Sequence, residues 1–273
     1  MSNNPYPHVA VAGNGAIATG LAALASRESR VLLLVRSEGS AARAAAALDR
    51  TCPRVEGSDR SRIAVTVDPA DLAGADLVIE AVVEDLEVKA ELLGRIGAIT
   101  EADLATTTSS LSVRELARRA GQPDRLFGLH VFNPVPVMRL VELCLPEELR
   151  AGTGERARAW CEHLGKAPVE VEDTPGFAVN RLLFPYLFDA VRYQERTGME
   201  SQDVDTCMTL GVAHPMGPLA LLDLIGLDVA IAIGEALHEE SGNPEHLAPK
   251  TVTTLAAGGH LGRKTGRGFY EYA

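Results

Sequence analysis

Two glycines near the N-terminus are the first residues whose spacing suggests chemistry. Gly13 and Gly15 follow the apolar run 8–12 and precede a segment from about Ile17 that has the periodicity of an amphipathic helix. A strand that turns through glycine into a helix presents the helix's first amides, which can bind a pyrophosphate. The spacing therefore predicts a dinucleotide-binding loop. The expected lining residues are Gly13, Asn14, Gly15, Ala16 and Ile17.

A glycine-containing turn without a ligand is the alternative interpretation, because this motif taken alone is weakly specific. A second apolar run, 31–35, follows after one helix length. Strand, helix and strand at this spacing are the parts of a βαβ nucleotide-binding unit, so the context favours the binding loop.

The end of the second predicted strand bears on which dinucleotide is bound. NAD-specific folds place Asp or Glu there to bind the ribose 2′-hydroxyl, whereas this chain has Val35, Arg36 and Ser37. An arginine can bind a 2′-phosphate through two hydrogen bonds, and an acid would repel it. We therefore predict that NAD(P)(H) binds, with NADP(H) favoured over NAD(H), and that Arg36 and Ser37 contact it. The alternative is an Arg36 that lies in solvent beside an NAD site without its usual acid.

Apolar runs typical of strands alternate with helical patterns up to about residue 171. The expected strands are 8–12, 31–35, 63–67, 76–83, 104–108, 126–131, 140–143 and 167–171. This alternation predicts a doubly wound sheet, in which ligands bind at the carboxyl ends of the strands. Glu84, Ser109 and His130 fall at or near such ends, and Ser110 is expected to cap the next helix.

The turn-rich segment 173–176 marks an expected domain boundary. Beyond it, apolar residues recur at three- and four-residue spacing, which predicts helices over 178–196, 201–210, 218–239 and 249–257. The fold class expected is α/β, with an N-terminal Rossmann-type doubly wound sheet in residues 1–174 and an all-helical C-terminal domain in residues 175–273. Helical domains with so many apolar faces often bind substrate and dimerise, so we expect a homodimer.

Composition and charge exclude several classes of protein. The chain has 273 residues, 46% of them hydrophobic and 23% charged, as in ordinary globular proteins. A net charge of −11 argues against nucleic acid as a partner. The most apolar long stretch, 219–233, contains two aspartates and is too short to cross a membrane. Four scattered cysteines and no visible signal segment indicate a cytoplasmic protein without a metal site.

Further distinctive segments occur along the whole chain: 82–89, 108–111, 128–138, 173–181, 215–218, 222–223 and 262–270. Together with the glycine loop they resemble, in the same order, the signature segments of the 3-hydroxyacyl-CoA dehydrogenases, including the 3-hydroxybutyryl-CoA dehydrogenases. The resemblance implies an oxidoreductase that transfers a hydride between a nicotinamide cofactor and C3 of a 3-hydroxyacyl or 3-oxoacyl thioester.

The resemblance also implies a role for individual residues. His130 matches the catalytic histidine, and Glu142 matches the acid that orients it. Ser109 and Asn180 match residues that contact the substrate oxygen and the nicotinamide side. Imidazole can take up and return a proton near neutral pH, and a carboxylate on its other nitrogen fixes the tautomer. Positions near the cofactor are matched by Glu84, Lys89, Ser109 and Asn133.

One segment departs from the family pattern, between the second strand and Glu84. The family carries a long basic helical hairpin there that binds the CoA nucleotide, whereas this segment is short and rich in alanine. Its remaining bases are Arg43, Arg50, Arg54, Arg60 and Arg62. Two alternatives therefore stay open: a dehydrogenase of a hydroxyacyl group, such as a glyceryl thioester, bound to an acyl carrier protein, and an NAD(P)-binding protein without turnover.

Overall fold

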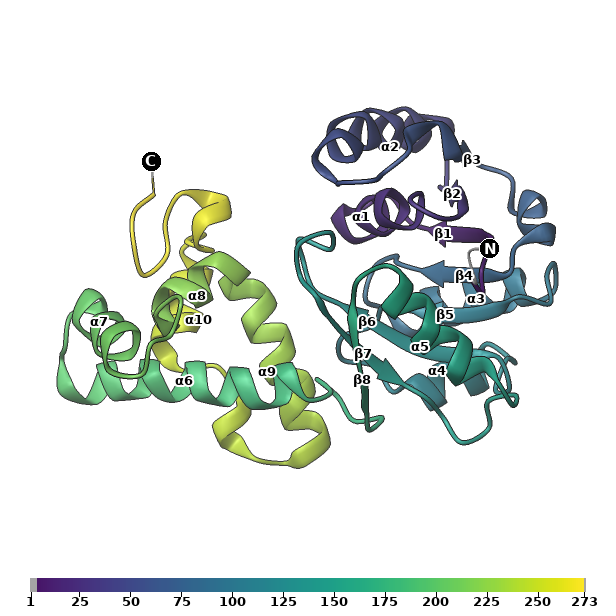
Figure 1. The fold of residues 1–273 in the computed structure, drawn as a ribbon. Coiled ribbons are helices and arrows are strands. Elements are labelled where there is room, and N and C mark those ends of the chain that lie inside the picture. The colour runs from purple at the N-terminus through teal and green to yellow at the C-terminus, as the bar shows by residue number, and fades with distance from the viewer. Residues whose placement is uncertain (1–3, 273) are drawn as a thin grey trace. The chain divides into compact units, whose positions relative to one another are not determined.

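The computed structural model describes residues 4–272, which divide into two compact units that meet between Thr174 and Pro175. The first unit is built on a β-sheet and the second consists of helices (Figure 1).

The sheet of the first unit has the strand order β3-β2-β1-β4-β5-β6-β7-β8. Strands β1 to β6 are parallel, β7 is antiparallel to β6, and β8 is parallel to β7. The strands are β1 (His8–Ala12), β2 (Arg30–Leu34), β3 (Ile63–Thr66), β4 (Leu77–Glu80), β5 (Asp103–Thr106), β6 (Leu126–Val131), β7 (Leu140–Cys144) and β8 (Ala167–Val171). The strand order reverses between β1 and β4, which is where doubly wound sheets bind ligands. The predicted sheet is confirmed.

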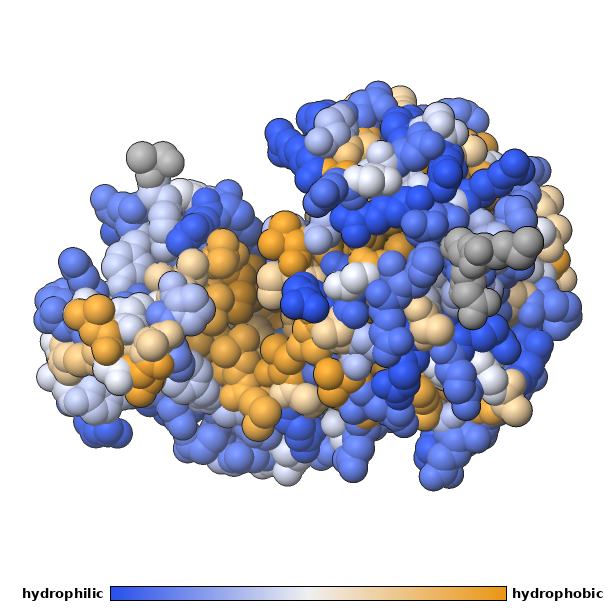
Figure 2. All heavy atoms as spheres, viewed as in Figure 1, coloured by the Kyte–Doolittle hydropathy of each residue, from blue (hydrophilic) through white to orange (hydrophobic). Residues whose placement is uncertain are grey.

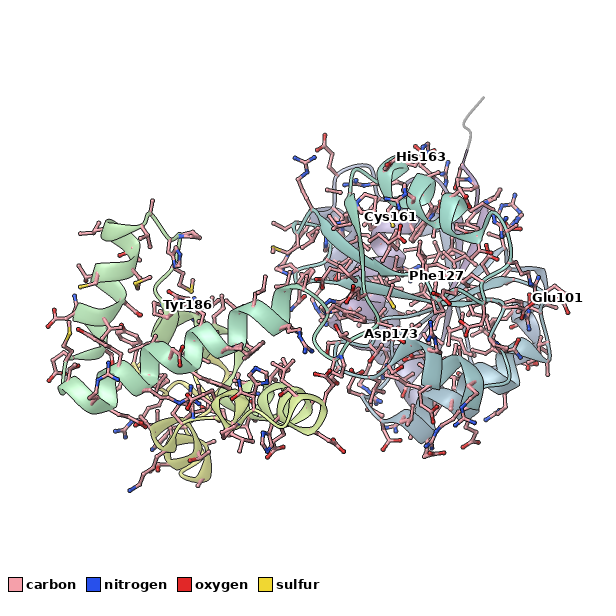
Figure 3. The ribbon with its side chains drawn as sticks, turned by 90° about the horizontal axis from the view of Figure 1, so that it is seen from below. Glu101, Phe127, Cys161, His163, Asp173 and Tyr186 are labelled. Carbon is pink, nitrogen blue, oxygen red and sulfur yellow. The ribbon has the colours of Figure 1, made fainter. Side chains whose placement is uncertain are left out.

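Helices cover both faces of this sheet, and each face has its own hydrophobic core. One core contains residues of α1 (Ala16–Ala25), α2 (Glu38–Thr51) and α5 (Thr153–His163), together with Phe127 of β6, which lies within the body of the unit in Figure 3. The other core contains residues of α3 (Leu86–Gly97) and α4 (Val113–Arg119). Strands buried on both faces explain why the sequence shows continuous apolar runs rather than alternation.

The second unit consists of five α-helices within the described residues: α6 (Val179–Thr197), α7 (Ser201–Gly211), α8 (Pro218–Ile225), α9 (Leu227–Ser241) and α10 (Lys250–Ala257). Short 3-10 helices complete the two units: η1 (Cys52–Arg54), η2 (Arg60–Arg62), η3 (Pro69–Gly74), η4 (Pro244–His246) and η5 (Arg263–Thr265). No helix in the described part of the chain is both long enough and apolar enough to span a membrane.

The expectation of one continuous helix over 218–239 is wrong. Gly226 separates α8 from α9 and has a φ of 106°, a backbone conformation that side-chain-bearing residues rarely adopt. A Cβ at this position would also lie 3.0 Å from Lys264 Nζ. The apolar spacing continues through the break because both helices pack on the same core, so periodicity alone could not reveal it.

Candidate active site

The carboxyl edge of the parallel strands collects the predicted site residues of the first unit. The glycine loop follows β1, Arg36 follows β2, Glu84 follows β4, and Ser109 follows β5. His130 lies near the end of β6. Because these strands are parallel and neighbouring, all of these residues lie along one edge of the sheet.

His130 and Glu142 are brought together by strand register. In the antiparallel pair β6–β7, His130 lies directly opposite Glu142. Residues opposite each other in such a pair place their side chains on the same face, about 5 Å apart. A shift of the register by one residue would put the carboxylate on the other face of the sheet.

The two side chains form a buried hydrogen-bonded pair. His130 Nδ1 lies 2.6 Å from Glu142 Oε2, and the side chains are 7% and 1% exposed. The imidazole also contacts Phe132, with ring centroids 4.6 Å apart. A carboxylate bound to Nδ1 directs the proton of the neutral ring to that nitrogen and leaves the transferable proton to Nε2.

Ser109 lies in a loop whose backbone is hydrogen-bonded to the Glu84 carboxylate. Glu84 Oε1 accepts hydrogen bonds from Thr108 Oγ1 at 2.7 Å and from the amides of Ser109 and Ser110 at 2.8 and 3.0 Å. The Ser109 hydroxyl makes a longer contact with the same oxygen, at 3.4 Å. The expectation that Ser110 caps the next helix is wrong. Its hydroxyl donates to Glu84, and Ser112 is the N-cap of α4.

Glu84 is in turn paired with Lys89, whose ammonium is enclosed by carboxylates. Lys89 Nζ lies 3.3 Å from Glu84 Oε2 and 2.8 Å from Glu80 Oε1, and the lysine side chain is only 1% exposed. Burial acts to raise the pKa of Glu84, but the Lys89 ammonium and the Thr108–Ser110 donors outweigh it and hold that pKa below its ordinary value.

Glu80 is the member of this network that the sequence interpretation missed. It is fully buried at the end of β4 and accepts hydrogen bonds from Thr106 Oγ1 at 2.7 Å and from the Val82 amide at 2.7 Å. A lone acid inside the apolar run 77–83, followed one helix turn into α3 by a lysine, is the signal that could have revealed it.

The glycine loop has the form that a dinucleotide requires. Gly13 has a φ of 144°, and a Cβ there would lie 2.3 Å from the carbonyl oxygen of Ala81 in the neighbouring strand segment. A Cβ on Gly15 would meet nothing within 4 Å, so this backbone faces open space at the N-terminus of α1. The residues therefore fit an approaching pyrophosphate.

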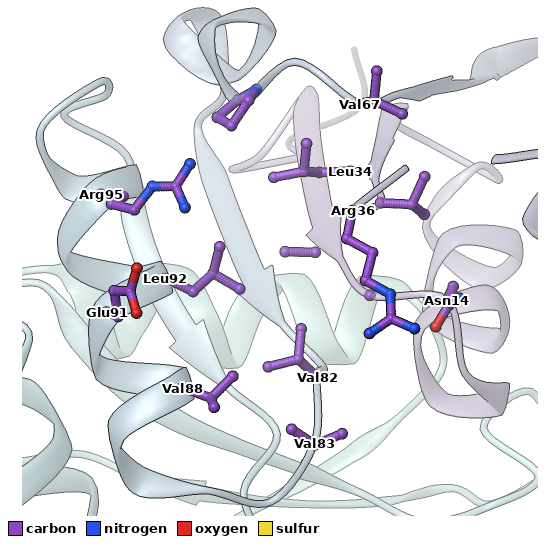
Figure 4. Close-up of a pocket in the computed structure, with 14 residues that line it drawn as sticks. Asn14, Leu34, Arg36, Val67, Val82, Val83, Val88, Glu91, Leu92 and Arg95 are labelled. Carbon is purple, nitrogen blue, oxygen red and sulfur yellow. The ribbon is translucent and has the colours of Figure 1, made fainter. Parts of the chain in front are cut away.

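Next to this loop lies a pocket of about 530 Å³. Its floor is apolar, and Figure 4 shows Leu34, Val82 and Val88 around it. Arg36 extends towards Asn14 on one side, and Arg95 of α3 lies across from it. Of these, Arg95 was not among the predicted site residues. Ser37, predicted to contact the cofactor, accepts a hydrogen bond from the Ser40 amide and caps α2.

The comparisons with known proteins agree with this geometry. A family model described as the NAD binding domain of 3-hydroxyacyl-CoA dehydrogenase matches residues 8–174, and the model of the C-terminal domain matches residues 176–272. Human mitochondrial hydroxyacyl-coenzyme A dehydrogenase is 39% identical over 285 residues, which cover 97% of this chain and 91% of the relative. The 3-hydroxybutyryl-CoA dehydrogenase of Clostridioides difficile is 36% identical over 97% of this chain and 99% of the relative.

Solved structures agree as well. FadB2 of M. tuberculosis matches with a TM-score of 0.94 and 36% identity, over 98% of this chain and 99% of that chain. The (S)-3-hydroxybutyryl-CoA dehydrogenase of Ralstonia eutropha matches with a TM-score of 0.89 and 35% identity over the same shares. This chain belongs to the 3-hydroxyacyl-CoA dehydrogenase family. Its function class is that of an oxidoreductase that uses a nicotinamide cofactor.

Within this hydroxyacyl dehydrogenase, the segment between β2 and β4 contains a single α-helix, α2, followed by short turns and β3. Three of its six arginines bind local groups: Arg43 donates to Ser40 Oγ, Arg60 pairs with Asp49, and Arg62 pairs with Asp59. The short segment expected from the sequence therefore contains no second α-helix that could pair with α2 as a hairpin.

The two remaining predicted site residues of the dehydrogenase are Asn133 and Asn180. Asn133 follows β6, in the loop that leads to β7. Asn180 is buried in the first turn of α6, in the second unit. No cluster of His, Cys, Asp and Glu among residues 4–272 is arranged to hold a metal ion.

Proposed function

We propose that the protein interconverts 3-hydroxyacyl and 3-oxoacyl thioesters, with His130 as the acid–base residue and Glu142 as its partner. The observation that carries this proposal is the buried 2.6 Å contact between His130 Nδ1 and Glu142 Oε2, at the sheet edge where the glycine loop also lies. A protein that only binds a nucleotide has no need of such a pair.

The chemistry assigned to these residues is proton transfer. Oxidation of the alcohol requires removal of the hydroxyl proton, and His130 Nε2 takes it while Glu142 stabilises the imidazolium that forms. In the reverse direction the same nitrogen returns the proton to the oxygen. A nicotinamide ring, when bound, accepts or supplies the hydride.

Ser109 and Asn180 are proposed to donate hydrogen bonds to the substrate oxygen, on which negative charge develops. Glu84 supports this role for Ser109 because it binds both adjacent amides of the loop. An effect of Lys89 on the cofactor would pass through Glu84, since the ammonium is enclosed. Asn133 is proposed to contact the cofactor from the β6–β7 loop.

The test compares His130→Ala with His163→Ala, a control histidine whose side chain is 30% exposed on α5 (Figure 3). Oxidation of NADPH or NADH by acetoacetyl-CoA is followed by absorbance, and cofactor binding by fluorescence. We expect about a thousandfold loss of kcat in His130→Ala with cofactor binding retained, and normal rates in the control. Normal turnover in His130→Ala would refute the assignment. A wild type that binds the cofactor but turns over no thioester would favour the binding protein.

For the cofactor, we propose a preference for NADP(H). Arg36 lines the pocket beside the glycine loop, and no acid occupies the end of β2. Arg36→Asp should weaken NADPH binding by about 1–3 kcal/mol through loss of a charged hydrogen bond. NADH binding should weaken less. Arg54→Asp, an exposed arginine in the same segment, is the control, and unchanged NADPH affinity in Arg36→Asp would refute the role.

The acyl carrier is CoA or a carrier protein. The single helix α2 favours a carrier-protein thioester, because fewer bases are presented to a CoA nucleotide. Comparison of kcat/KM for acetoacetyl-CoA and an acetoacetyl carrier protein decides between them. A higher value with CoA would reject the carrier protein.

We also propose a cytoplasmic homodimer. Its four cysteines are unpaired, as expected for a reducing compartment. The second unit exposes an apolar face on α6 and α8 that includes Leu182 and Leu224, 76% and 49% exposed, and Figure 2 shows hydrophobic side chains gathered on its surface. Sedimentation should give a dimer that Leu182→Glu dissociates, and a monomeric wild type would refute this.

A further inference from the structure

Lys166, in the turn between α5 and β8, is a buried cation with an unusual set of partners. It is 8% exposed, and its ammonium donates to the backbone carbonyl oxygen of Val135 and, at 2.7 Å, to that of Met138. No carboxylate among the described residues pairs with it.

This placement is costly for a purely structural residue. Burial, together with the nearby Arg27, lowers the pKa of the Lys166 ammonium. A buried charge without a counter-ion destabilises a fold, and an apolar side chain of the same size would usually cost less. The location of the two carbonyls indicates what the ammonium contributes.

Both carbonyls belong to the loop that joins β6 to β7, and therefore joins His130 to Glu142. Within it, the Pro134 carbonyl accepts hydrogen bonds from the amides of Val137 and Met138 at 2.9 and 3.0 Å. Lys166 thus binds two carbonyl groups of this turn, those of Val135 and Met138.

The same loop packs on α1, the helix that follows the glycine loop. Val135 is 1% exposed. A Cβ added to Gly20 of α1 would lie 3.0 Å from Val135 Cβ and 3.6 Å from Pro136 Cδ. A larger residue at position 20 would therefore press on the loop, because the loop lies against the helix here.

We infer that Lys166 is a positioning residue of the active site: its ammonium fastens the β6–β7 loop against α1, so that Asn133 and the His130–Glu142 pair are held in one arrangement with the glycine loop. The inference rests on the proposed function for the role of these residues. It extends that function to a residue that contacts neither substrate nor cofactor.

The first test measures the loop directly, in the full chain without substrate. Amide hydrogen exchange at Val137 and Met138 should be about tenfold faster in Lys166→Met. Lys166→Arg, which keeps charge and donors, should restore part of the protection. Lys250→Met, an exposed lysine at the start of α10, is the control and should change nothing at these amides.

The second test measures turnover and NADPH affinity at a temperature where each variant is folded. A loosened loop should lower kcat about ten- to hundredfold in Lys166→Met, weaken NADPH binding and leave partial activity in Lys166→Arg. Gly20→Ala, which pushes on the loop from α1, should show the same pattern and replaces Lys166→Met if that variant does not fold. Unchanged exchange, or faster exchange with wild-type kcat and affinity, would overturn the inference. If the wild type turns over no thioester, the exchange and affinity results still decide the positioning role, whereas the proposed function fails separately.

Discussion

Glu80 and Glu142 are both almost fully buried in strands of the same sheet, and each pairs with a basic side chain. Glu80 binds Lys89, and Glu142 binds His130. The two pairs differ in the base. A lysine keeps its proton near neutral pH, whereas a histidine can release one and take it up again.

Because of this difference, we propose a structural role for the first pair and a reactive role for the second. The Glu80–Lys89 pair also bonds Thr106 and the Val82 amide, and Lys89 extends the network to Glu84. This network fixes the backbone at the Val82 amide and, through Glu84, at the amides of Ser109 and Ser110. The His130–Glu142 pair joins side chains on opposite strands through a 2.6 Å contact, and its base is one that can exchange a proton near neutral pH.

The largest effect expected from the difference between the two pairs is a loss of kcat when the His130–Glu142 pair is altered. Glu142→Gln keeps the size of the side chain but removes the charge that fixes the imidazole tautomer. We expect kcat to fall about a thousandfold or more, with a loss of unfolding free energy of only about 1 kcal/mol from one weakened hydrogen bond. Steady-state kinetics and urea denaturation measure the two quantities. A large loss of stability with little loss of kcat would make this pair structural as well.

The next effect is on stability, at the other pair. Glu80→Gln leaves the Lys89 ammonium buried with only the more distant Glu84, so we expect the free energy of unfolding to fall by about 3 kcal/mol. In the double variant Glu80→Gln/Lys89→Met no charge is left unpaired, and part of the loss should be recovered. Urea denaturation measures both. Equal stability of Glu80→Gln and wild type would show that the Glu80–Lys89 pair does not stabilise the fold.

The smallest effect concerns Glu84, which links the structural pair to the Ser109 loop. Glu84→Gln weakens the bonds that hold the loop, so kcat should fall about tenfold with a stability loss of about 1 kcal/mol. Asp85→Asn, at the neighbouring N-cap of α3, is the control for charge. Wild-type kcat in Glu84→Gln would separate this carboxylate from the site.

The pH dependence of that stability difference has a definite sign. Because the folded pKa of Glu84 is below its ordinary value, the carboxylate stabilises the fold at all pH values above the unfolded pKa of about 4.3. This contribution is lost as the pH falls through the lower folded pKa. The difference between wild type and Glu84→Gln should therefore be constant near neutral pH and shrink below about pH 4.3. A difference that grows on acidification would contradict the assignment.

The pattern of apolar residues and glycines along the chain was sufficient to predict much of the fold. Continuous apolar runs predicted the strands because burial on both faces leaves no polar position. The glycine loop could be recognised because Gly13 and Gly15 act through their own backbone. Motif resemblance, rather than spacing, led to the pairing of His130 with Glu142.

Tertiary structure decided what depends on partners distant in sequence. Strand register placed Glu142 opposite His130, packing of α3 on β4 enclosed Lys89 between two carboxylates, and the turn before β8 brought Lys166 to the β6–β7 loop. Gly226 divides a segment whose apolar spacing continues without interruption. The sequence by itself determined which segments bury apolar area, because that property is local. Which polar groups meet depends on strand register and on the packing of separate elements, so the pattern of residues along the chain does not determine it.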